Sequence, residues 1–446
     1  MCQKRSERFT ASPFDAVALT MGDRSQLEAL AQTFVSDNLR QYLIHSAMGL
    51  DKVDDRRWKV VKTKETLRVY SERSQRDMAR RARKHLAAQA SRTCTEDDEA
   101  EYSVSELPVM FSAGTLVGEL DDVMFGVVSP TLELMRIKSS YVDDMGAAAV
   151  LATVTEPTLD DPFCSLVIKW MELDLPLSRA GLVKNRDFVY MEATGIVQLG
   201  HGGDRIGYHL MHSVHFPQTV DLPHKVRGRL SLCSFFRQTS PDIVEHYSSG
   251  TIDPGGVIPR ALLVRATASQ MLASLRYAYC GQMKKLTWML QQKREEWRAG
   301  DKPSKLLTPE RICVTCRSKA GGLFSSKCCI CLGDLCMSCS IKKRLSFLSP
   351  ESSLVRCKVS VCTSCMLEGL HVSASRAARD QLFGPAMGSA FATCLSETSS
   401  DLSVSPTAWS RSRCEGRPTK SYNANIMLKA FVSPHQLQAG KKGSLG

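Results

Sequence analysis

The sequence predicts an α+β protein in which a curved antiparallel sheet packs around a long helix, followed by a small cysteine-rich module and a disordered tail. Three observations lead to this prediction. Short alternating stretches succeed one another over residues 109–251, a helical pattern of about forty residues follows them, and four Cys-x2-Cys pairs lie between Cys313 and Cys365.

The composition indicates an intracellular protein with more than one domain. The chain has 446 residues, of which 43% are hydrophobic, and its net charge is +12. Residues 301–365 carry 11 Lys and Arg against 4 Asp and Glu, whereas residues 1–300 are nearly neutral. No apolar stretch approaches the roughly eighteen residues of a membrane-spanning helix, and the charged N-terminus predicts no secretory signal. We therefore expect a cytoplasmic protein.

The first elements are a flexible arm over residues 1–22 and a helix from Asp23. Apolar residues recur there every three or four positions, Asp23 begins a capping-box pattern, and Gly49 suits the helix end. Residues 58–70 then alternate like a single strand. Residues 73–106 contain a basic run and then an acidic one, which favours a solvated insertion loop over a membrane-binding helix.

Seven strands are predicted from the alternating stretches that follow. One or two short helices are expected within residues 119–140, and the run Gly200–Asp204 has the composition of a hairpin turn. The predicted strands cover residues 109–117, 147–155, 163–172, 188–199, 206–216, 226–237 and 243–251.

A long helix is the clearest element of the sequence. The run Asp253-Pro254-Gly255-Gly256 breaks the chain, Pro259 suits a first helical turn, and apolar positions continue to about residue 298. We expect this helix to bury its apolar face against the sheet. A curved sheet closed by one helix leaves an interior space, so the sequence also predicts a cavity, although it does not identify the residues that line it.

Three short motifs resemble the START superfamily of lipid-binding domains, which have a helix-grip fold. They are Trp58-Lys59-Val60-Val61, Asn185-Arg186-Asp187-Phe188-Val189-Tyr190 and Asp253-Pro254-Gly255-Gly256-Val257-Ile258-Pro259. The resemblance covers about residues 50–298 and implies that the domain encloses a lipid or sterol, held by burial of its apolar surface. The alternative is a docking domain whose cavity is filled by its own side chains.

Catalytic motifs were not found, which predicts that the protein is not an enzyme. The sequence contains neither a Gly-x-Ser-x-Gly motif nor a nucleotide-binding glycine loop. His209, His212 and His215 lie on one alternating strand, which places His212 on the opposite face and separates the other two by about 20 Å. We predict that these histidines do not share a metal ion.

The four Cys-x2-Cys pairs are the strongest chemical signal. Their eight thiolates are sufficient for two tetrahedral Zn²⁺ sites, each contributing about 10 kcal/mol of folding free energy. Cys329 and Cys357 are expected to be free thiols. The predicted metal ligands are Cys313, Cys316, Cys328, Cys331, Cys336, Cys339, Cys362 and Cys365.

The run from Lys327 to Ser340 resembles the centre of a FYVE zinc finger, which has the same four-residue gap between its second and third cysteine pairs. The resemblance implies a crossed arrangement of the ligands; pairing of neighbouring knuckles is the alternative. In the crossed arrangement one zinc binds Cys313, Cys316, Cys336 and Cys339, and the other binds Cys328, Cys331, Cys362 and Cys365.

The phosphoinositide-binding residues of that family are largely missing. The family's basic stretch aligns with Phe324–Cys329 and retains a single cation, Lys327, so the resemblance gives little support for recognition of phosphatidylinositol 3-phosphate. Leu323 and Phe324 occupy the positions of the membrane-inserting loop. We therefore take Leu323, Phe324 and Lys327 as candidates for contact with an anionic endosomal membrane, and protein binding by the finger as the alternative.

The predicted organisation is an arm over 1–22, a START-like domain over 23–298, a linker over 299–310, a FYVE-related finger over 311–370 and a disordered tail over 371–446. The predicted function is that of a lipid carrier or membrane adaptor, peripheral on membranes. The alternative is a scaffold with an empty START-like fold and a protein-binding finger. Nucleic acid is not expected as a partner, because no helix carries a basic stripe and aromatic residues are scarce in the finger.

Overall fold

The structure is a computed structural model, and the chain divides into two compact units, Met1–Gly281 and Gln282–Gly446. The division lies inside the predicted long helix, whereas the sequence predicted a domain end at residue 298. The structure describes residues 12–49, 52–74, 77–81, 83, 107–142, 147–173, 184–200, 202–256, 258–300, 311–320, 326–349 and 354–383.

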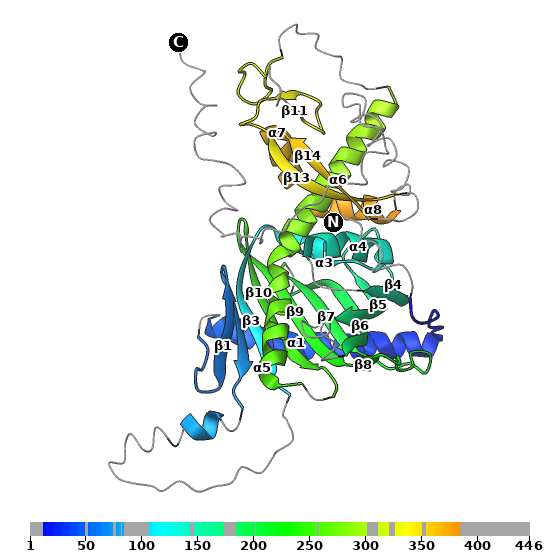
Figure 1. Cartoon of the computed structure of the whole chain (residues 1–446), viewed down its shortest axis with the longest axis vertical. Helices are drawn as coiled ribbons and strands as arrows, with labels where there is room; N and C mark the ends of the chain where they lie inside the picture. Colours follow the sequence, from blue (N-terminus) through cyan, green and yellow to red (C-terminus); the bar gives the residue numbers. More distant parts are fainter. Residues whose placement is uncertain are drawn as a thin grey trace, which may run out of the picture. The chain divides into compact units, whose positions relative to one another are not determined.

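Unit 1 is built on a ten-stranded sheet (Figure 1). Its strand order is β1-β2-β3-β10-β9-β7-β6-β5-β4, and β8 pairs with β6 in parallel. The central pair, β3 with β10, joins strands that are far apart in the sequence. The strands are β1 (Trp58–Lys64), β2 (Leu67–Glu72), β3 (Val109–Val117), β4 (Ala148–Thr155), β5 (Ser165–Leu173), β6 (Asn185–Gln198), β7 (Arg205–Ser213), β8 (Lys225–Arg227), β9 (Arg229–Ser240) and β10 (Ile243–Asp253).

The predicted α+β class and the seven alternating stretches are confirmed, with two local differences. Residues 58–70 form the hairpin β1–β2 instead of one strand, because Glu65 takes the left-handed backbone conformation, with φ of 54°, and turns the chain. The stretch 226–237 is divided into β8 and β9 at Gly228. A Cβ atom on Gly228 would lie 2.5 Å from the Phe188 ring, so only glycine fits there.

Helix α1 (Met21–Met48) covers one face of this sheet and contacts β4, β7 and β9. Its capping box begins at Thr20 rather than at Asp23, which corrects the sequence prediction. The Thr20 hydroxyl accepts a hydrogen bond from Asp23 N at 3.1 Å, and the Asp23 carboxylate accepts one from Thr20 N at 2.8 Å. The helix ends at Gly49, as predicted, where φ is 92°.

The predicted arm is packed from residue 12 onward, contrary to the expectation of a flexible segment. Phe14 is 8% exposed and makes an edge-on contact with Trp170, with ring centroids 6.4 Å apart. Val17 N donates a hydrogen bond to Leu151 O at 2.9 Å. Two apolar side chains separated by two residues are enough to hold this segment against the sheet, a pattern too short to detect as a period.

The other face of the sheet carries α3 (Leu120–Val127), α4 (Leu132–Val142), α5 (Arg260–Met271), the 3₁₀ segment η3 (Leu272–Arg276) and the start of α6 (Tyr277–Arg298). The predicted long helix is therefore interrupted by η3. The Ser274 hydroxyl in η3 donates to Met271 O at 2.9 Å. Such a side-chain bond to the backbone competes with the regular helix, and a 3₁₀ stretch within a helix often marks a hinge.

Helices α3 and α6 touch backbone to backbone at two glycines. A Cβ on Gly126 would lie 1.9 Å from Tyr277 O, and one on Gly281 would lie 1.9 Å from Asp122 O. Gly281 interrupts the apolar pattern of the helix because the close contact with α3 leaves space only for glycine at this position.

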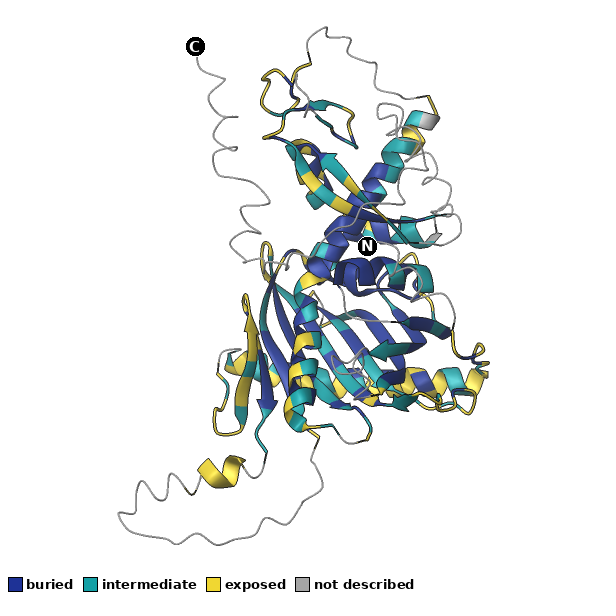
Figure 2. Cartoon of the chain, in the orientation of Figure 1, coloured by how far each residue is buried: buried dark blue, intermediate teal, exposed yellow. Residues whose placement is uncertain are grey.

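Unit 2 contains α6 from Gln282 onward, the pairs β11 (Ser326–Lys327) with β12 (Asp334–Leu335) and β13 (Ile341–Leu348) with β14 (Leu354–Val361), and α7 (Thr363–His371) and α8 (Ala374–Phe383). Leu286 and Met289 of α6 pack closely against Gly369 of α7, so there is no room for a side chain at position 369. The second half of α6 is therefore part of the core of unit 2, as the buried segments in Figure 2 illustrate.

Helix α8 corrects the prediction that the tail is disordered from residue 371. Ala374, Ala377 and Ala378 are buried, and small side chains at this spacing allow close packing. Trp288 Nε1 in α6 donates a hydrogen bond to Asp380 of α8 at 3.0 Å. The rest of the tail, 384–446, and most of the insertion, 84–106, lie outside the described residues. No described helix is long and apolar enough to cross a membrane.

Candidate functional site

A cavity of about 100 Å³ lies between the sheet of unit 1 and the segments α5, η3 and α6. It is lined by alternate residues of β5, β6, β7, β9 and β10, whose side chains share one face of the sheet. Its lining is divided by chemistry. The apolar residues are Met171, Leu173, Phe188, Met211, Leu230, Leu232, Ile252 and Met271, and the polar ones are Lys138, Glu192, His209, Ser234, His246, Ser248, Gln270, Ser274 and Tyr277.

Glu192 is the centre of a buried charged cluster in this lining. Its carboxylate forms an ion pair with Lys169, accepts a hydrogen bond from His209 Nε2 at 2.9 Å, and lies 3.9 Å from Lys138 Nζ. Burial alone would raise the pKa of Glu192, but the two lysines lower it well below its usual value, so the carboxylate is ionised. Burial lowers the pKa of His209 and keeps its imidazole neutral.

His246 is a second buried polar group in the cavity wall. Its Nε2 lies 3.3 Å from Ser112 Oγ and 3.2 Å from Ser274 Oγ, and burial lowers its pKa to about 3. In the tautomer that carries its proton on Nε2, His246 donates to Ser274 Oγ, whose own hydroxyl donates to Met271 O. Nδ1 is then an acceptor, and it has no hydrogen-bond partner among the described residues.

An apolar seam extends the cavity beneath α5. A smaller space of about 20 Å³ adjoins it and shares the lining residues Leu173, Phe188 and Ile252. Ile258 and Leu262 line the far side of the seam, near the start of α5. The cavity therefore has a polar end around Glu192 and an apolar extension along α5.

These cavity residues were not predicted from the sequence. Lys169 and Glu192 were visible as charges inside otherwise apolar strands, which is the signal that could have drawn attention to them. The predicted placement of His209 and His212 on opposite faces is confirmed, whereas the strand ends before His215. His209 lines the cavity, whereas His212 lies on the opposite face, where its ring stacks 4.0 Å from that of Phe34, and His215 is exposed beyond the end of β7.

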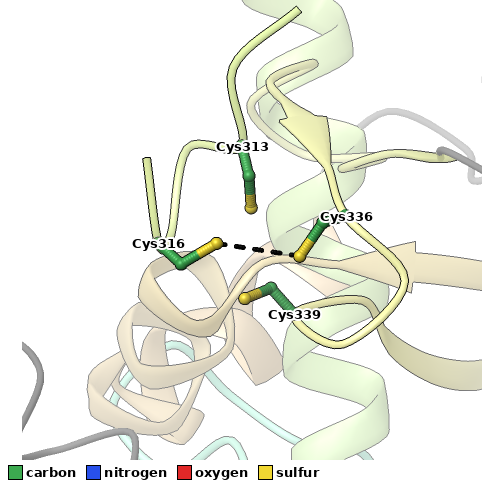
Figure 3. A group of neighbouring side chains, drawn as sticks. All are labelled: Cys313, Cys316, Cys336 and Cys339. Carbon is green, nitrogen blue, oxygen red and sulfur yellow. Dashed lines mark hydrogen bonds between the residues drawn. The ribbon is translucent and has the colours of Figure 1, made fainter. Parts of the chain in front are cut away.

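The eight predicted metal-ligand cysteines of unit 2 form two groups of four. Figure 3 shows the group that contains Cys313. Within each group all four sulfur atoms lie within 4.8 Å of one another. The grouping is the crossed one that the FYVE resemblance implies. One group contains Cys313, Cys316, Cys336 and Cys339, and the other contains Cys328, Cys331, Cys362 and Cys365.

Both groups have the dimensions of a tetrahedral thiolate site. A Zn–S bond of about 2.3 Å places tetrahedral sulfur atoms about 3.8 Å apart. The Sγ atoms of Cys316 and Cys336 are 3.7 Å apart, and those of Cys331 and Cys362 are 3.9 Å apart. Cys362 N also donates to Cys328 Sγ at 3.3 Å, an interaction that favours the thiolate over the thiol. The groups can therefore hold one metal ion each.

The predicted membrane-contact residues stay a prediction. Lys327 is exposed in β11, and Leu323 and Phe324 lie outside the described residues. Cys329 and Cys357 belong to neither cysteine group.

Three solved human structures are similar to part of this chain. Human StAR-related lipid transfer protein 5 has 13% identity, with 58% of this chain and 98% of its own covered, at a TM-score of 0.38. Human STARD10 has 12% identity, covering 66% of this chain and 92% of its own, at a TM-score of 0.34. The lipid transfer and protein localization domain of human StarD13 has 13% identity, covering 54% of this chain and 95% of its own, at a TM-score of 0.33. No family profile and no curated protein matches the sequence.

Proposed function

We propose that the protein is a non-enzymatic carrier that encloses one amphipathic lipid or sterol in the cavity of unit 1. The observation that carries this proposal is the two-ended cavity, with buried polar groups around Glu192 and an apolar seam beneath α5. An acyl chain or ring system gains about 0.8 kcal/mol for each methylene that it buries. The polar head of the ligand lies at the other end, where His246 Nδ1 accepts a hydrogen bond from a hydroxyl group.

Loading requires the cavity to widen. A cavity of about 150 Å³ holds one benzene molecule, so the present 100 Å³ is smaller than any membrane lipid. The 3₁₀ segment η3 lies between α5 and α6 and forms the hinge about which α5 moves away from the sheet. Such a movement opens the seam along its length, from Met271 toward Ile258.

In unit 2 we propose that each cysteine group binds one structural Zn²⁺ ion and that the finger docks the protein on a membrane. The tetrahedral sulfur spacing supports the first part, and the excess of cations over residues 301–365 supports the second. The protein is then cytoplasmic and peripheral on anionic endomembranes.

The small cavity also favours a second candidate, a scaffold whose START-like fold remains empty. In that case unit 1 is a docking domain and the finger binds protein. The two candidates differ in whether a lipid is bound in stoichiometric amount.

Native mass spectrometry of the full chain, incubated with mixed cellular lipids, tests the carrier. We expect one lipid and two zinc ions per chain. Leu232→Trp fills the cavity and should abolish lipid binding, whereas Val60→Trp, at a position that is 50% exposed on β1, should leave it unchanged. If no lipid binds under conditions that load a known carrier, the scaffold is the better description.

A further inference from the structure

The hairpin of β13 and β14 has two chemically different faces. Residues directly opposite each other in an antiparallel pair point to the same face, and successive residues alternate between the faces. One face is mostly apolar, with Lys343 as its one cation, and includes Leu345 and Val361, both fully buried. The other carries four exposed cations: Lys342, Arg344, Arg356 and Lys358.

These four cations, the hairpin cations, lie close together. Arg344 is directly opposite Lys358. Lys342 is two positions before Arg344 on β13, and Arg356 is two positions before Lys358 on β14. Opposed residues have Cβ atoms about 5 Å apart, and residues two apart on one strand are separated by about 7 Å. The four charges therefore lie near one another on one face of the hairpin.

The described residues of unit 2 do not neutralise this surface. Among them, none of the hairpin cations forms an ion pair or a side-chain hydrogen bond. Like charges placed directly opposite each other destabilise a hairpin, so the pair Arg344–Lys358 works against folding. Four cations on one face without a described counter-charge favour an anionic binding partner.

The geometry favours a bilayer over other polyanions. The face of the hairpin that carries the cations has no aromatic side chain on which a nucleic acid base could stack. A plane of lipid phosphates complements several neighbouring cations on one face and requires no specific stereochemistry.

We propose that the hairpin cations dock unit 2 on the surface of an anionic bilayer. The inference rests on the docking part of the proposed function and specifies the surface that makes the contact. It also explains how a finger that lacks most of the FYVE headgroup residues could still bind membranes. These cations lie along β13 and β14, outside the aligned headgroup stretch Phe324–Cys329.

Flotation of the full-length protein with vesicles tests the proposal. The probe is phosphatidylcholine mixed with phosphatidylserine, compared with phosphatidylcholine alone. Arg344→Gln with Lys358→Gln removes two positive charges and should weaken vesicle binding about 30-fold. Each cation near an anionic surface contributes about 1 kcal/mol to binding, and about 1.4 kcal/mol corresponds to a tenfold change in affinity. Lys342→Gln with Arg356→Gln should give a similar loss, and binding should weaken as salt is raised.

The matched control is Lys59→Gln with Lys64→Gln, which removes two exposed cations from β1 of unit 1. Its binding should equal that of the unmodified protein. All variants should retain two zinc ions, because replacing exposed cations with glutamine breaks no described contact. The unfolding midpoint should be no lower than that of the unmodified protein, and it should rise slightly in Arg344→Gln with Lys358→Gln, which removes two opposed like charges.

Three results would overturn the proposal: equal binding by the hairpin variants, equal binding to phosphatidylcholine alone, or tighter binding to a single-stranded oligonucleotide that the same substitutions abolish. Lipid loading in solution, measured by native mass spectrometry without vesicles, separates this inference from the carrier function. An unmodified protein that floats with anionic vesicles but never loads lipid would contradict the carrier and leave the docking surface intact.

Discussion

His246 is a fully buried imidazole, and its surroundings oppose protonation. In the unfolded chain it binds a proton below about pH 6.5, whereas in the folded protein its pKa is lowered to about 3. The unfolded state therefore binds more protons throughout this window. The contribution of His246 to stability is complete above pH 6.5 and is lost as the pH falls toward 3.

We expect the free energy of unfolding of unit 1 to fall when the pH is lowered from about 7 to about 5, by up to about 1.4 kcal/mol per pH unit for His246. Urea unfolding, followed by fluorescence at several pH values, measures this slope. His246→Gln should reduce it, leaving the contribution of His209, whose pKa is also lowered by burial. Glu192 acts in a different window, because its unfolded pKa is 4.5 and its stabilising charge is lost only below that value. An identical slope in the variant would show that His246 is not buried as described.

At the scale of elements, the crossing of α3 and α6 depends on two glycines. Gly126 and Gly281 allow each helix to approach the backbone of the other, which neither a methyl group nor any larger side chain permits. This crossing secures the start of α6, and Tyr277 at that start lines the cavity. The packing of the two helices therefore positions one wall of the cavity.

Gly281→Ala should destabilise unit 1 by about 1–3 kcal/mol, because its Cβ would lie 1.9 Å from Asp122 O and the helices would have to move apart. The matched control is Gly22→Ala in α1, where the nearest atom to a Cβ is 3.7 Å away. That substitution should be neutral or slightly stabilising, since alanine is the better helix former. Urea midpoints of the two variants provide the comparison, and equal midpoints would contradict the close crossing.

At the scale of the whole molecule, the crossed cysteine groups tie unit 2 together. In the sequence, Cys328 and Cys331 lie between the two cysteine pairs that form the first group. The chain loop closed by a metal ion at either group therefore contains two of the ligands of the other metal ion. Unit 1 contains none of these cysteines and holds a large core of its own. The two units should therefore respond differently to loss of metal.

Chelation should remove hydrogen-exchange protection from the cysteine-rich part of unit 2 and leave the sheet of unit 1 protected, since metal binding supplies about 10 kcal/mol per site. Cys331→Ser should lower the zinc content from two ions to less than one, because loss of one site loosens the loop that holds the other. Cys357→Ser, at a cysteine outside both groups, should retain two. Elemental analysis and native mass spectrometry measure the zinc content of both variants. Retention of one fully protected zinc site in Cys331→Ser would mean that the two sites are independent.

The elements that could be predicted from the sequence are those whose signal is local. Strands such as β3 and β10 were predicted nearly residue for residue, because alternation records which face of a strand is buried. The cysteine pairs were equally clear, since a two-residue spacing directly reflects the geometry of one metal. Helix α1 and the break before α5 followed from capping and glycine positions that act within a few residues.

Which distant segments meet could be learned only from the folded chain. The pairing of β3 with β10, the charged cluster around Glu192 and the crossing at Gly126 and Gly281 join residues that no local period connects. The same holds for α6, whose second half packs with α7 and α8, although its apolar pattern continues from unit 1 without a visible boundary. A periodic pattern predicts that one face of a helix or strand is buried. It does not predict which segment packs against that face, because the packing partner is selected by shape and charge in three dimensions.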